Sequence, residues 1–487
     1  MILAIDQGTT GSTCMVFSAD GKIAGRAYRE FEQHFPKPGW VEHDASEIWD
    51  VTEAVAKEAI DDAGIQGGDL EAIGITNQRE TIVAWDKASG EPLARAIVWQ
   101  DRRTADRCAQ LKEAGKEQLV RERTGLVLDP YFSGTKIEWL IKEGGVDASR
   151  AAFGTIDAWL IHKLCDGRFA TDYTNASRTL LFDIEKLTWS DELCEMLGVN
   201  PESLPEPCPS AHEFGATTLF GGTVPVAGVA GDQQAALYGQ ACLEPGLGKN
   251  TYGTGSFVLE NAGSARPSPA DGLLTTVAWG VEGRVDYALE AAIFVTGAAV
   301  QWLRDGLGVI ESADETEALA ESLDSNEGVY FVPALTGLGS PHWDPYARGT
   351  IVGLTRGSTK AHLARAALEA MAYQTVDAVR AMEQSSGVKL EELRADGGAT
   401  ANAWMLQFQA DLLGVPVVVP EISETTALGA AYLAGVAAGT WSEADVRAMW
   451  TEAARYEPQM GGDQRGELMD GWTRAVRTTR NHSRATG

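Results

Sequence analysis

The chain has 487 residues, which is too long for one hydrophobic core and therefore predicts two domains with a ligand-binding cleft between them. Its hydrophobic content of 44% and its 53 glycines are typical of a soluble α/β protein, and its apolar runs are too short to span a membrane. The formal net charge of −29 disfavours nucleic acids and anionic membranes as partners, because both bind clustered positive charge.

The start of the chain and its cysteines indicate the compartment. Met1 leads directly into an apolar stretch, without the basic segment or the cleavage site of a secretory signal. The six cysteines form no CxxC pair, so we interpret them as reduced, buried thiols with no metal or disulfide role. We therefore expect a cytoplasmic protein.

The first predicted elements are three strands of a β-meander. They cover Ile2–Ile5, Thr13–Phe17 and Ile23–Glu30. The turn between the first two, Gly8–Gly11, combines glycines with threonines, so its backbone amides and hydroxyls can approach an anion. Asp6 precedes this turn and could hold Mg²⁺ through water, although an ordinary hairpin turn would have the same sequence.

A helix and three further strands follow. The helix is predicted over Glu47–Asp62, capped by Ser46 and ended by the glycine at position 64. The strands are predicted at Ala72–Thr76, Thr81–Trp85 and Ala94–Trp99. Mixed strands and helices of this kind predict an α/β fold.

Arg79 and Glu80 follow the first of these strands. Adjacent Arg and Glu side chains are usually a solvated ion pair of little consequence. A small polyol, however, offers only hydroxyl groups, so its pocket must supply donors and acceptors together, as this pair does. Trp99, Tyr131 and Phe257 could form apolar walls, but each by itself is more often a core residue.

Asp232 lies between the strand Val224–Ala230 and a helix predicted over Gln234–Gly239. By default an aspartate in this place is a helix N-cap. Phosphoryl transfer to an alcohol also needs a carboxylate beside the attacking hydroxyl, as general base and orienting acceptor. Both interpretations are open from position alone.

A second glycine-threonine turn, Gly253–Gly255, lies between short strands about half the chain after the first. Two such turns indicate duplicated lobes that face each other, which we place at residues 1–245 and 246–487. A triphosphate held between two lobes needs a cradle from each of them. The second turn therefore favours a phosphate-binding interpretation of both.

The C-terminal half is predicted to be richer in helices, at residues 359–385, 401–413 and 425–439. Gly398 precedes the second of these, where backbone without side chains lets an adenine or ribose lie flat, and Asn402 could donate to it. Gly297 and Gln301 share one predicted helix face, an arrangement that a packed glycine and a solvated glutamine would also produce.

Two long segments carry a family resemblance. Tyr131–Leu140 matches one signature of the FGGY carbohydrate kinases, and Gly349–Leu354 with His362, Leu363 and Ala366 matches the other. With the two turns, the chain resembles that family over essentially its whole length. The resemblance implies a two-lobed, actin-like ATPase fold (ribonuclease H-like), with duplicated mixed β-sheet domains and flanking helices.

Four further segments, Asn77–Glu80, Trp99–Arg103, Gly125–Tyr131 and Gly231–Gln234, resemble the branch of the family that phosphorylates glycerol. By that resemblance the glycerol hydroxyls would be bound by Arg79, Glu80, Tyr131, Asp232 and Gln233. Trp99 and Phe257 would cover the carbons of glycerol, and Asp232 would be the general base.

The resemblance also implies ATP and Mg²⁺ as cofactors. Phosphates would be bound by Thr9, Thr10 and Gly11 in the first lobe and by Thr254 in the second. The nucleoside would be bound by Gly297, Gln301, Gly398 and Asn402, and Asp6 would help to place Mg²⁺. Relatives are often homodimers or homotetramers, which we expect here too.

The sequence departs from the family at three places. Thr13 stands where many glycerol-phosphorylating relatives have an arginine, so one cationic contact to phosphate is missing, and Ser256 stands where relatives often have Cys. The segment 217–224 lacks both the arginine that binds fructose 1,6-bisphosphate in some relatives and the histidine that is phosphorylated in others. We therefore expect neither control to operate, and inhibition by fructose 1,6-bisphosphate would contradict this.

Two alternatives to glycerol phosphorylation stay open from the sequence. One keeps the fold but has a larger sugar such as xylulose as substrate. The other is a non-catalytic, actin-like nucleotide switch, because a fold by itself does not decide function. The polyol-contacting segments favour catalysis, since a switch that closes on ATP alone has no use for them.

Overall fold

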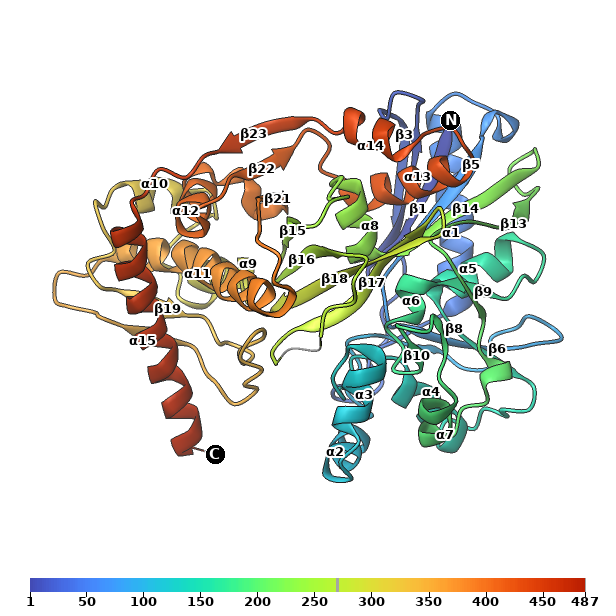
Figure 1. Cartoon of the computed structure of the whole chain (residues 1–487), viewed down its shortest axis with the longest axis horizontal. Helices are drawn as coiled ribbons and strands as arrows, with labels where there is room; N and C mark the ends of the chain where they lie inside the picture. Colours follow the sequence, from blue (N-terminus) through green and yellow to red (C-terminus); the bar gives the residue numbers. More distant parts are fainter. Residues whose placement is uncertain (269–270, 487) are drawn as a thin grey trace.

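The computed structural model describes residues 1–268 and 271–486 and has two lobes, each built around a mixed β-sheet with helices packed against it (Figure 1). The N-terminus lies in one lobe, and the C-terminal helix runs along the far end of the other. The predicted α/β class is confirmed.

The first sheet has six strands in the order β13-β14-β5-β1-β2-β3. Strands β1, β2 and β3 are consecutive antiparallel neighbours, as predicted, whereas β5 is parallel to both β1 and β14. The bounds are β1 Ile2–Gln7, β2 Gly11–Phe17, β3 Ile23–Glu30, β5 Ala72–Asn77, β13 Ala211–Thr217 and β14 Val224–Gly231.

The second sheet repeats this arrangement. Its order is β17-β18-β16-β15-β21-β22-β23, and its central strand β15 has an antiparallel neighbour, β16, on one side and a parallel one, β21, on the other, as β1 has. Strand β22 continues the parallel part and β23 ends it antiparallel, as β14 and β13 do. The bounds are β15 Leu247–Tyr252, β16 Ser256–Gly263, β17 Leu274–Val281, β18 Arg284–Ile293, β21 Glu392–Gly397, β22 Val417–Pro420 and β23 Glu452–Tyr456. The duplication expected from the two turns is therefore present in the sheets.

A smaller four-stranded sheet, in the order β4-β7-β6-β8, belongs to the first lobe. Its strands are β4 Glu42–His43, β6 Ile82–Asp86, β7 Ala96–Ile97 and β8 Ala151–Thr155. The strand predicted at 94–99 is thus only two residues long. Outside it, the backbone N of Leu93 donates to Ala84 O and that of Trp99 donates to the side chain of Thr81, and neither bond belongs to a strand ladder. The other first-lobe elements are α2 Ala105–Glu113, α3 Glu117–Thr124, α4 Gly134–Lys142, α5 Ile156–Leu164, β9 Ala170–Asp172, α6 Tyr173–Ala176, β10 Phe182–Asp183, β11 Thr188–Trp189, α7 Asp191–Leu197 and β12 Glu206–Cys208.

Helix α1 (Ala45–Asp62) starts two residues before the prediction. Its N-cap is Asp44, whose Oδ1 accepts from the backbone N of Ser46 (2.9 Å) and of Glu47 (3.2 Å). The prediction of Ser46 as the cap is therefore wrong, since that residue is already helical and donates to the true cap. The helix packs on β2 and β3.

Helices α8 (Asp232–Gly239) and α13 (Thr425–Ala437) join the two lobes. Although α13 belongs to the second half of the chain, it packs against β14, β5 and β1 of the first sheet and against α8. The first sheet is therefore covered by α1 and α5 on one face and by α13 on the other. The division at residues 245 and 246 remains a prediction.

The predicted C-terminal helices correspond to α11 (Lys360–Ser386), α12 (Ala403–Leu413) and α13. A short 3-10 turn, η4 (Gly398–Ala401), precedes α12, so the helix begins after it. The remaining elements are α9 Gly297–Gln301, a π-helical turn at Trp302–Gly306, α10 Glu315–Glu321, β19 Tyr330–Val332, β20 Thr350–Val352, α14 Glu443–Met449 and α15 Gly462–Thr486.

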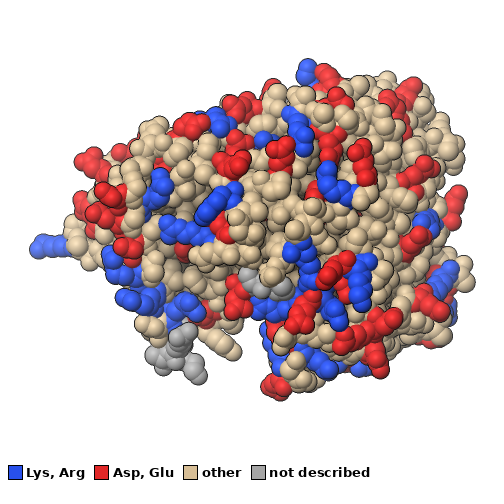
Figure 2. Space-filling model, in the orientation of Figure 1, with Lys and Arg blue, Asp and Glu red and all other residues tan. Residues whose placement is uncertain are grey.

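The distribution of surface charge and the state of the cysteines match what the amino-acid composition predicted. Acidic side chains are spread over both lobes on the face that Figure 2 shows, with Lys and Arg among them. All six cysteines are free and buried, as predicted. Within 1–268 and 271–486, no helix is both long enough and apolar enough to cross a membrane.

Candidate active site

Three parallel strands of the first sheet bring the predicted polyol residues to one edge. Strands β1, β5 and β14 end level with one another, because Gln7 and Gly231 both pair with Asn77. Ligands of open α/β sheets bind at the carboxyl ends of such strands. Asp6 lies near the end of β1, Arg79 and Glu80 follow β5, and Asp232 follows β14 directly.

Asp232 contacts Arg79 at this edge. Its Oδ1 lies 3.0 Å from Arg79 Nε, and the side chain of Asp232 is 33% exposed whereas that of Arg79 is 1% exposed. Asp232 is the first residue of α8, the N-cap is Gly231, and Asp232 Oδ1 accepts from the backbone N of Gln233 (2.7 Å). The N-cap interpretation is thus wrong, and an accessible carboxylate stands beside a buried cation.

Arg79 and Glu80 belong to a buried cluster of four charges. Arg79 Nη1 donates to Glu290 Oε2 (2.6 Å), Arg178 Nη2 donates to Glu290 Oε1 (2.9 Å), and Arg178 Nε donates to Glu80 Oε1 (2.6 Å). Buried charges are tolerated when they are paired and hydrogen-bonded in this way. The pair predicted at residues 79 and 80 is therefore not the ordinary solvated one.

Burial and pairing act in opposite directions on these groups. Burial raises the pKa of both Glu80 and Glu290, and the arginines oppose it. For Glu290 the guanidinium of Arg178, with that of Arg79, outweighs burial and holds the pKa at about 2. For Glu80 burial prevails, and its pKa stays above the ordinary value.

The backbone at Glu80 is strained. Its φ of 61° lies in the left-handed region, which a non-glycine residue adopts only where the surrounding structure holds it. Ser133 Oγ donates to the carbonyl oxygen of Glu80 (2.9 Å) and so holds this peptide from the predicted signature segment 131–140. The carboxylate of Glu80 is aimed by this local conformation.

Aromatic side chains stand next to the charged cluster. Trp99 and Tyr131 make an edge-to-face contact with ring centroids 5.5 Å apart, and Trp99 Nε1 donates to Thr9 Oγ1 (2.9 Å) in the first turn. Burial, and next the charge of Glu80, raise the pKa of Tyr131 above its ordinary value, so its hydroxyl stays protonated and can donate. Phe257 pairs with Ala292 and so shares a sheet face with Glu290, two residues away.

Gln233 contacts a buried lysine that the sequence did not single out. Lys249 Nζ donates to Gln233 Oε1 and to Thr251 Oγ1, the latter at 2.9 Å. Burial lowers the pKa of Lys249 to about 8. The lysine lies in β15 of the second lobe, so it brings positive charge from that lobe to the residue next to Asp232.

The charge of Asp232 also acts on Asp6. Burial, and next the charge of Asp232, raise the pKa of Asp6 to about 7. Its neighbours in register are Thr13 on β2 and Thr76 on β5, neither of which carries a charge. A buried carboxylate whose charge is destabilised by a neighbouring carboxylate is an environment that favours a bound cation.

Both glycine-threonine turns connect two strands through three residues, and in each the first glycine bonds to a carbonyl at or next to the end of the turn, three residues on in the first turn and two in the second. The backbone N of Gly8 donates to Gly11 O (2.9 Å), and that of Gly253 donates to Gly255 O (2.8 Å). The second turn also accepts bonds from the start of α9, because Gly297 N donates to Gly253 O (3.1 Å). Each turn joins the central strand of its sheet to the antiparallel neighbour.

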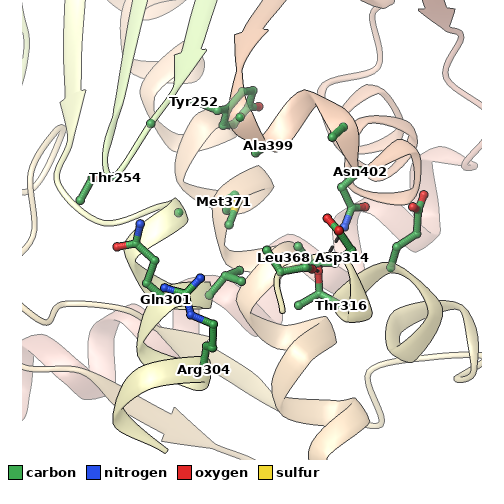
Figure 3. A pocket seen from close by; sticks show the side chains of 17 residues that line it. Tyr252, Thr254, Gln301, Arg304, Asp314, Thr316, Leu368, Met371, Ala399 and Asn402 are labelled. Atoms are coloured by element: carbon green, nitrogen blue, oxygen red, sulfur yellow. Dashed lines mark hydrogen bonds between the residues drawn. The ribbon is translucent and has the colours of Figure 1, made fainter. Parts of the chain in front are cut away.

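A cavity of about 540 Å³ opens beside the second turn (Figure 3). It collects all five predicted nucleotide residues of the second lobe, namely Thr254, Gly297, Gln301, Gly398 and Asn402. Thr9, Thr10 and Gly11 are not among its lining residues and belong to the other lobe. The sequence did not single out Arg304, Asp314 or Thr316, which also line it.

Asn402 has a structural role in this cavity. Its Oδ1 caps α12 by accepting from the backbone N of Met405 (2.9 Å), and its Nδ2 donates to Thr316 Oγ1 (3.3 Å), the bond drawn in Figure 3. Gln301 and Arg304 reach the cavity from α9 and the π-helical turn. The amide of Asn402 is thus already bonded within the protein, and its contact with a nucleoside stays a prediction.

Comparison with known protein families gives two adjacent matches. Residues 1–239 match the N-terminal domain of the FGGY family of carbohydrate kinases, and residues 248–438 match the C-terminal domain. Among curated proteins, the chain is 56% identical to a glycerol kinase of Deinococcus radiodurans over 490 residues (99% of this chain, 97% of the relative). It is 54% identical to glycerol kinase 2 of Thermotoga maritima over 484 residues, 98% of each chain.

Solved structures show the same likeness in three dimensions. A crystal structure of Plasmodium falciparum glycerol kinase with ADP has a TM-score of 0.94 and 34% identity, and 98% of each chain is covered. A gluconate kinase from Lactobacillus acidophilus has a TM-score of 0.90 at 22% identity, with 99% of this chain and 98% of that one covered, and shows the fold alone.

Proposed function

Because this chain belongs to the FGGY family of carbohydrate kinases, we propose that it transfers the γ-phosphoryl group of ATP to glycerol, giving ADP and sn-glycerol 3-phosphate. The observation that carries this proposal is the accessible carboxylate of Asp232, 3.0 Å from the buried guanidinium of Arg79. The curated relatives named glycerol kinases, which match nearly the whole chain, identify the acceptor.

Recognition of glycerol would use groups of both polarities at the edge of the first sheet. Arg79 and the protonated Tyr131 can donate to hydroxyl oxygens, and the carboxylates of Glu80 and Asp232 can accept from hydroxyl hydrogens. Gln233 would complete the set of polar contacts. Trp99 and Phe257 would cover the carbon atoms, which leaves room for a short triol.

The transfer step would proceed by direct in-line displacement. Asp232 accepts the proton of the attacking glycerol hydroxyl, whose oxygen forms a bond to the γ-phosphorus while the bond from that phosphorus to the β–γ bridging oxygen breaks. The bridging oxygen leaves on ADP. The proton ends on Asp232 Oδ, from which it passes to solvent, since this side chain is 33% exposed.

Mg²⁺ fits the residues around Asp6. Within the described part of the chain, no group of three or more His, Cys, Asp and Glu side chains could form a cage for a metal ion. Mg²⁺ is instead bound through one or two carboxylates together with substrate phosphates in many kinases. Asp6, whose pKa is raised to about 7 by burial and by Asp232, would supply one such carboxylate. The bound ion would neutralise charge on the phosphates.

The nucleotide would span both lobes. Thr9, Thr10 and Gly11 in the first turn and Thr254 in the second would bind the phosphates through backbone amides and hydroxyls. The cavity that Gly297, Gln301, Gly398 and Asn402 line would hold the nucleoside, and its volume of about 540 Å³ suits a ligand of that size. Lys249 and Arg79 would supply the positive charge that an arginine at position 13 provides in many relatives, where this chain has Thr13.

Location and assembly follow from the family membership as further parts of the proposal. The enzyme would act in the cytoplasm, where ATP is available, and would form a homodimer or a homotetramer. Sedimentation equilibrium of the purified chain would measure the assembly, and a monomer at all concentrations would contradict it.

The proposal is tested by ADP release at fixed Mg·ATP, measured with glycerol present and absent. A large glycerol-dependent rate is expected, together with formation of sn-glycerol 3-phosphate. Equal rates in both conditions would contradict the proposal and would favour a nucleotide switch. Xylulose, ribulose and gluconate, assayed side by side, should each give a lower kcat/KM than glycerol, because the aromatic walls crowd longer chains.

A further inference from the structure

Glu290 connects the two lobes at the charged cluster. It lies in β18 of the second sheet, whereas Arg79 follows β5 of the first, and the two residues are 211 positions apart in the sequence. Arg79 Nη1 donates to Glu290 Oε2 (2.6 Å) and Nη2 donates to Glu290 Oε1 (3.3 Å), so one carboxylate holds both ends of the guanidinium fork. Such two-point contacts fix orientation as well as position.

The contacts of Arg79 leave a defined part of it for the substrate. A guanidinium has five N–H donors. Among the described residues, three of them are used, two on Glu290 and one on Gln234 Oε1 (3.2 Å). Two donors are left: the Nε–H, whose nitrogen lies 3.0 Å from Asp232 Oδ1, and the second Nη2–H. Glu290 therefore decides which donors of Arg79 face the reaction.

The same carboxylate limits how strongly Arg79 binds the base. Asp232 and Glu290 both contact this guanidinium, but the side chain of Glu290 is 1% exposed whereas that of Asp232 is 33% exposed. Glu290 also accepts from Arg178 Nη2 (2.9 Å), so it is fixed from two sides. Without it, Arg79 would be free to turn its Nη donors toward Asp232, which is the group that must bind the glycerol hydroxyl.

We propose that Glu290 is a positioning residue for the transfer reaction, holding Arg79 across the two lobes so that Nε faces Asp232 and the bound polyol. The inference rests on the proposed function, because it assigns Arg79 to the glycerol site. Glu290 does not line the nucleotide cavity, so we expect it to affect the KM for glycerol and not the KM for Mg·ATP.

The test compares Glu290→Gln with wild-type enzyme in steady-state kinetics, varying glycerol and Mg·ATP separately. Gln keeps the shape but removes the charge, and a charge-assisted contact is worth roughly a 10- to 150-fold change. We expect the KM for glycerol to rise by about that factor and the KM for Mg·ATP to stay unchanged. Glu282→Gln is the matched control, since it removes a carboxylate from the exposed turn before β18 and should leave both KM values unchanged.

A second variant covers the case in which Glu290→Gln fails to fold. Glu290→Asp keeps the charge that balances Arg79 and Arg178 but withdraws the carboxylate by one methylene, so it cannot reach both. We expect a smaller rise in the KM for glycerol than with Glu290→Gln, and a smaller loss of thermal stability, because the negative charge stays in the cluster. A folded Glu290→Asp or Glu290→Gln enzyme with a wild-type KM for glycerol overturns the inference, as does a fall in kcat alone, which reports only fewer active molecules.

Wild-type kinetics separate an error in the role of Glu290 from an error in the substrate. If the proposed function is wrong, the wild-type enzyme shows no glycerol-dependent release of ADP. If only the role of Glu290 is wrong, the wild-type enzyme is active and the Glu290 variants behave like Glu282→Gln.

Discussion

Asp232 and Arg79 differ in exposure although their atoms are 3.0 Å apart, because Arg79 is enclosed by Glu290 and Gln234 while Asp232 starts a helix at the edge of the sheet. The carboxylate of Asp232 is therefore open to an incoming hydroxyl group. It also explains why an Arg-Glu pair that looks like surface charge in the sequence is found in the interior. The partners that make burial possible, Arg178 and Glu290, come from distant segments.

Replacing Asp232 by Asn tests the base directly. The amide keeps the shape but cannot accept the hydroxyl proton, so we expect kcat to fall by roughly 10²- to 10⁴-fold. The dissociation constant of Mg·ADP, measured by calorimetry, should change by less than about twofold because the nucleoside cavity lies elsewhere. Asp20→Asn, in the exposed turn after β2, is the control. An Asp232→Asn enzyme with normal turnover would remove this residue from the role of base.

Asp6 should make stability depend on pH. A carboxyl whose pKa is raised to about 7 in the folded protein binds its proton more tightly there than in the unfolded chain. Its contribution therefore favours folding at low pH and is lost as the pH rises from about 4 to about 7. In EDTA, the free energy of unfolding of Asp6→Asn relative to wild type should rise by about 1–3 kcal/mol over that range.

The measurement is urea unfolding of both proteins at several pH values. Asp20→Asn should not gain stability in this way, because the pKa of Asp20 is lowered by its bonds to Ser18 and Lys22. A constant difference between Asp6→Asn and wild type from pH 4 to pH 8 would show that Asp6 titrates normally.

The 3-10 turn η4 lines the nucleotide cavity through a glycine, which has no side chain. A Cβ on Gly398 would meet no atom within 4 Å, and Gly398 lines the cavity, so the added methyl group would point into open space there. The fold does not need glycine at this position. A nucleotide that lies against position 398 would need glycine there, because a side chain would occupy the space of the ligand.

Gly398→Ala should therefore separate binding from stability. We expect the midpoint of thermal unfolding to stay unchanged and the KM for Mg·ATP to rise by about tenfold or more, since a misplaced methyl group in a ligand contact costs about 1–3 kcal/mol. The KM for glycerol should be unaffected. Gly461→Ala is matched, because it also has no neighbour within 4 Å and lies outside the cavity. An unchanged KM for Mg·ATP would place the nucleotide away from η4.

Helix starts show what local sequence can and cannot specify. Asp44 and Ser46 are both good N-cap residues, and they stand two positions apart before the same apolar periodicity. The structure uses Asp44, whose backbone is extended (φ −87°, ψ 114°) and follows directly from β4. The backbone direction at the end of β4 therefore decides which of the two residues becomes the N-cap.

Helices α8 and α13 hold the two lobes together and pack against each other through small residues. A Cβ on Gly239 would lie 2.0 Å from Thr425 O, and one on Gly429 would lie 1.8 Å from Ala235 O, so the two helices touch through their backbones. Helix α8 begins at Asp232, the predicted base. The packing of the two lobes thus sets the position of the reactive carboxylate.

Gly239→Ala should disturb this packing. We expect a loss of about 1–3 kcal/mol in the free energy of unfolding from overpacking, and a lower kcat because α8 must move. Gly466→Ala in α15 is the control, since its Cβ meets nothing within 4 Å and alanine favours a helix. Urea unfolding and turnover measure both effects. Wild-type values for Gly239→Ala would mean that the helices have room to separate.

Most residues that gather at the sheet edge and in the cavity were predicted with the help of the family resemblance. The α/β class, the main strands and helices, and the duplication could be predicted from residue patterns alone. Those features depend on local periodicity, turn residues and strand ends, which are determined within a few neighbouring positions. The roles of the predicted site residues in catalysis and binding remain predictions.

The sequence did not predict that Arg178, Glu290 and Lys249 surround those residues, or that α13 covers the first sheet; both depend on the folded arrangement of the two lobes. A buried charge is stable only beside its partner, and these partners are separated by up to 211 residues, so no local pattern specifies them. They meet because two separately patterned sheets pack through α8 and α13, and that contact exists only in the folded chain.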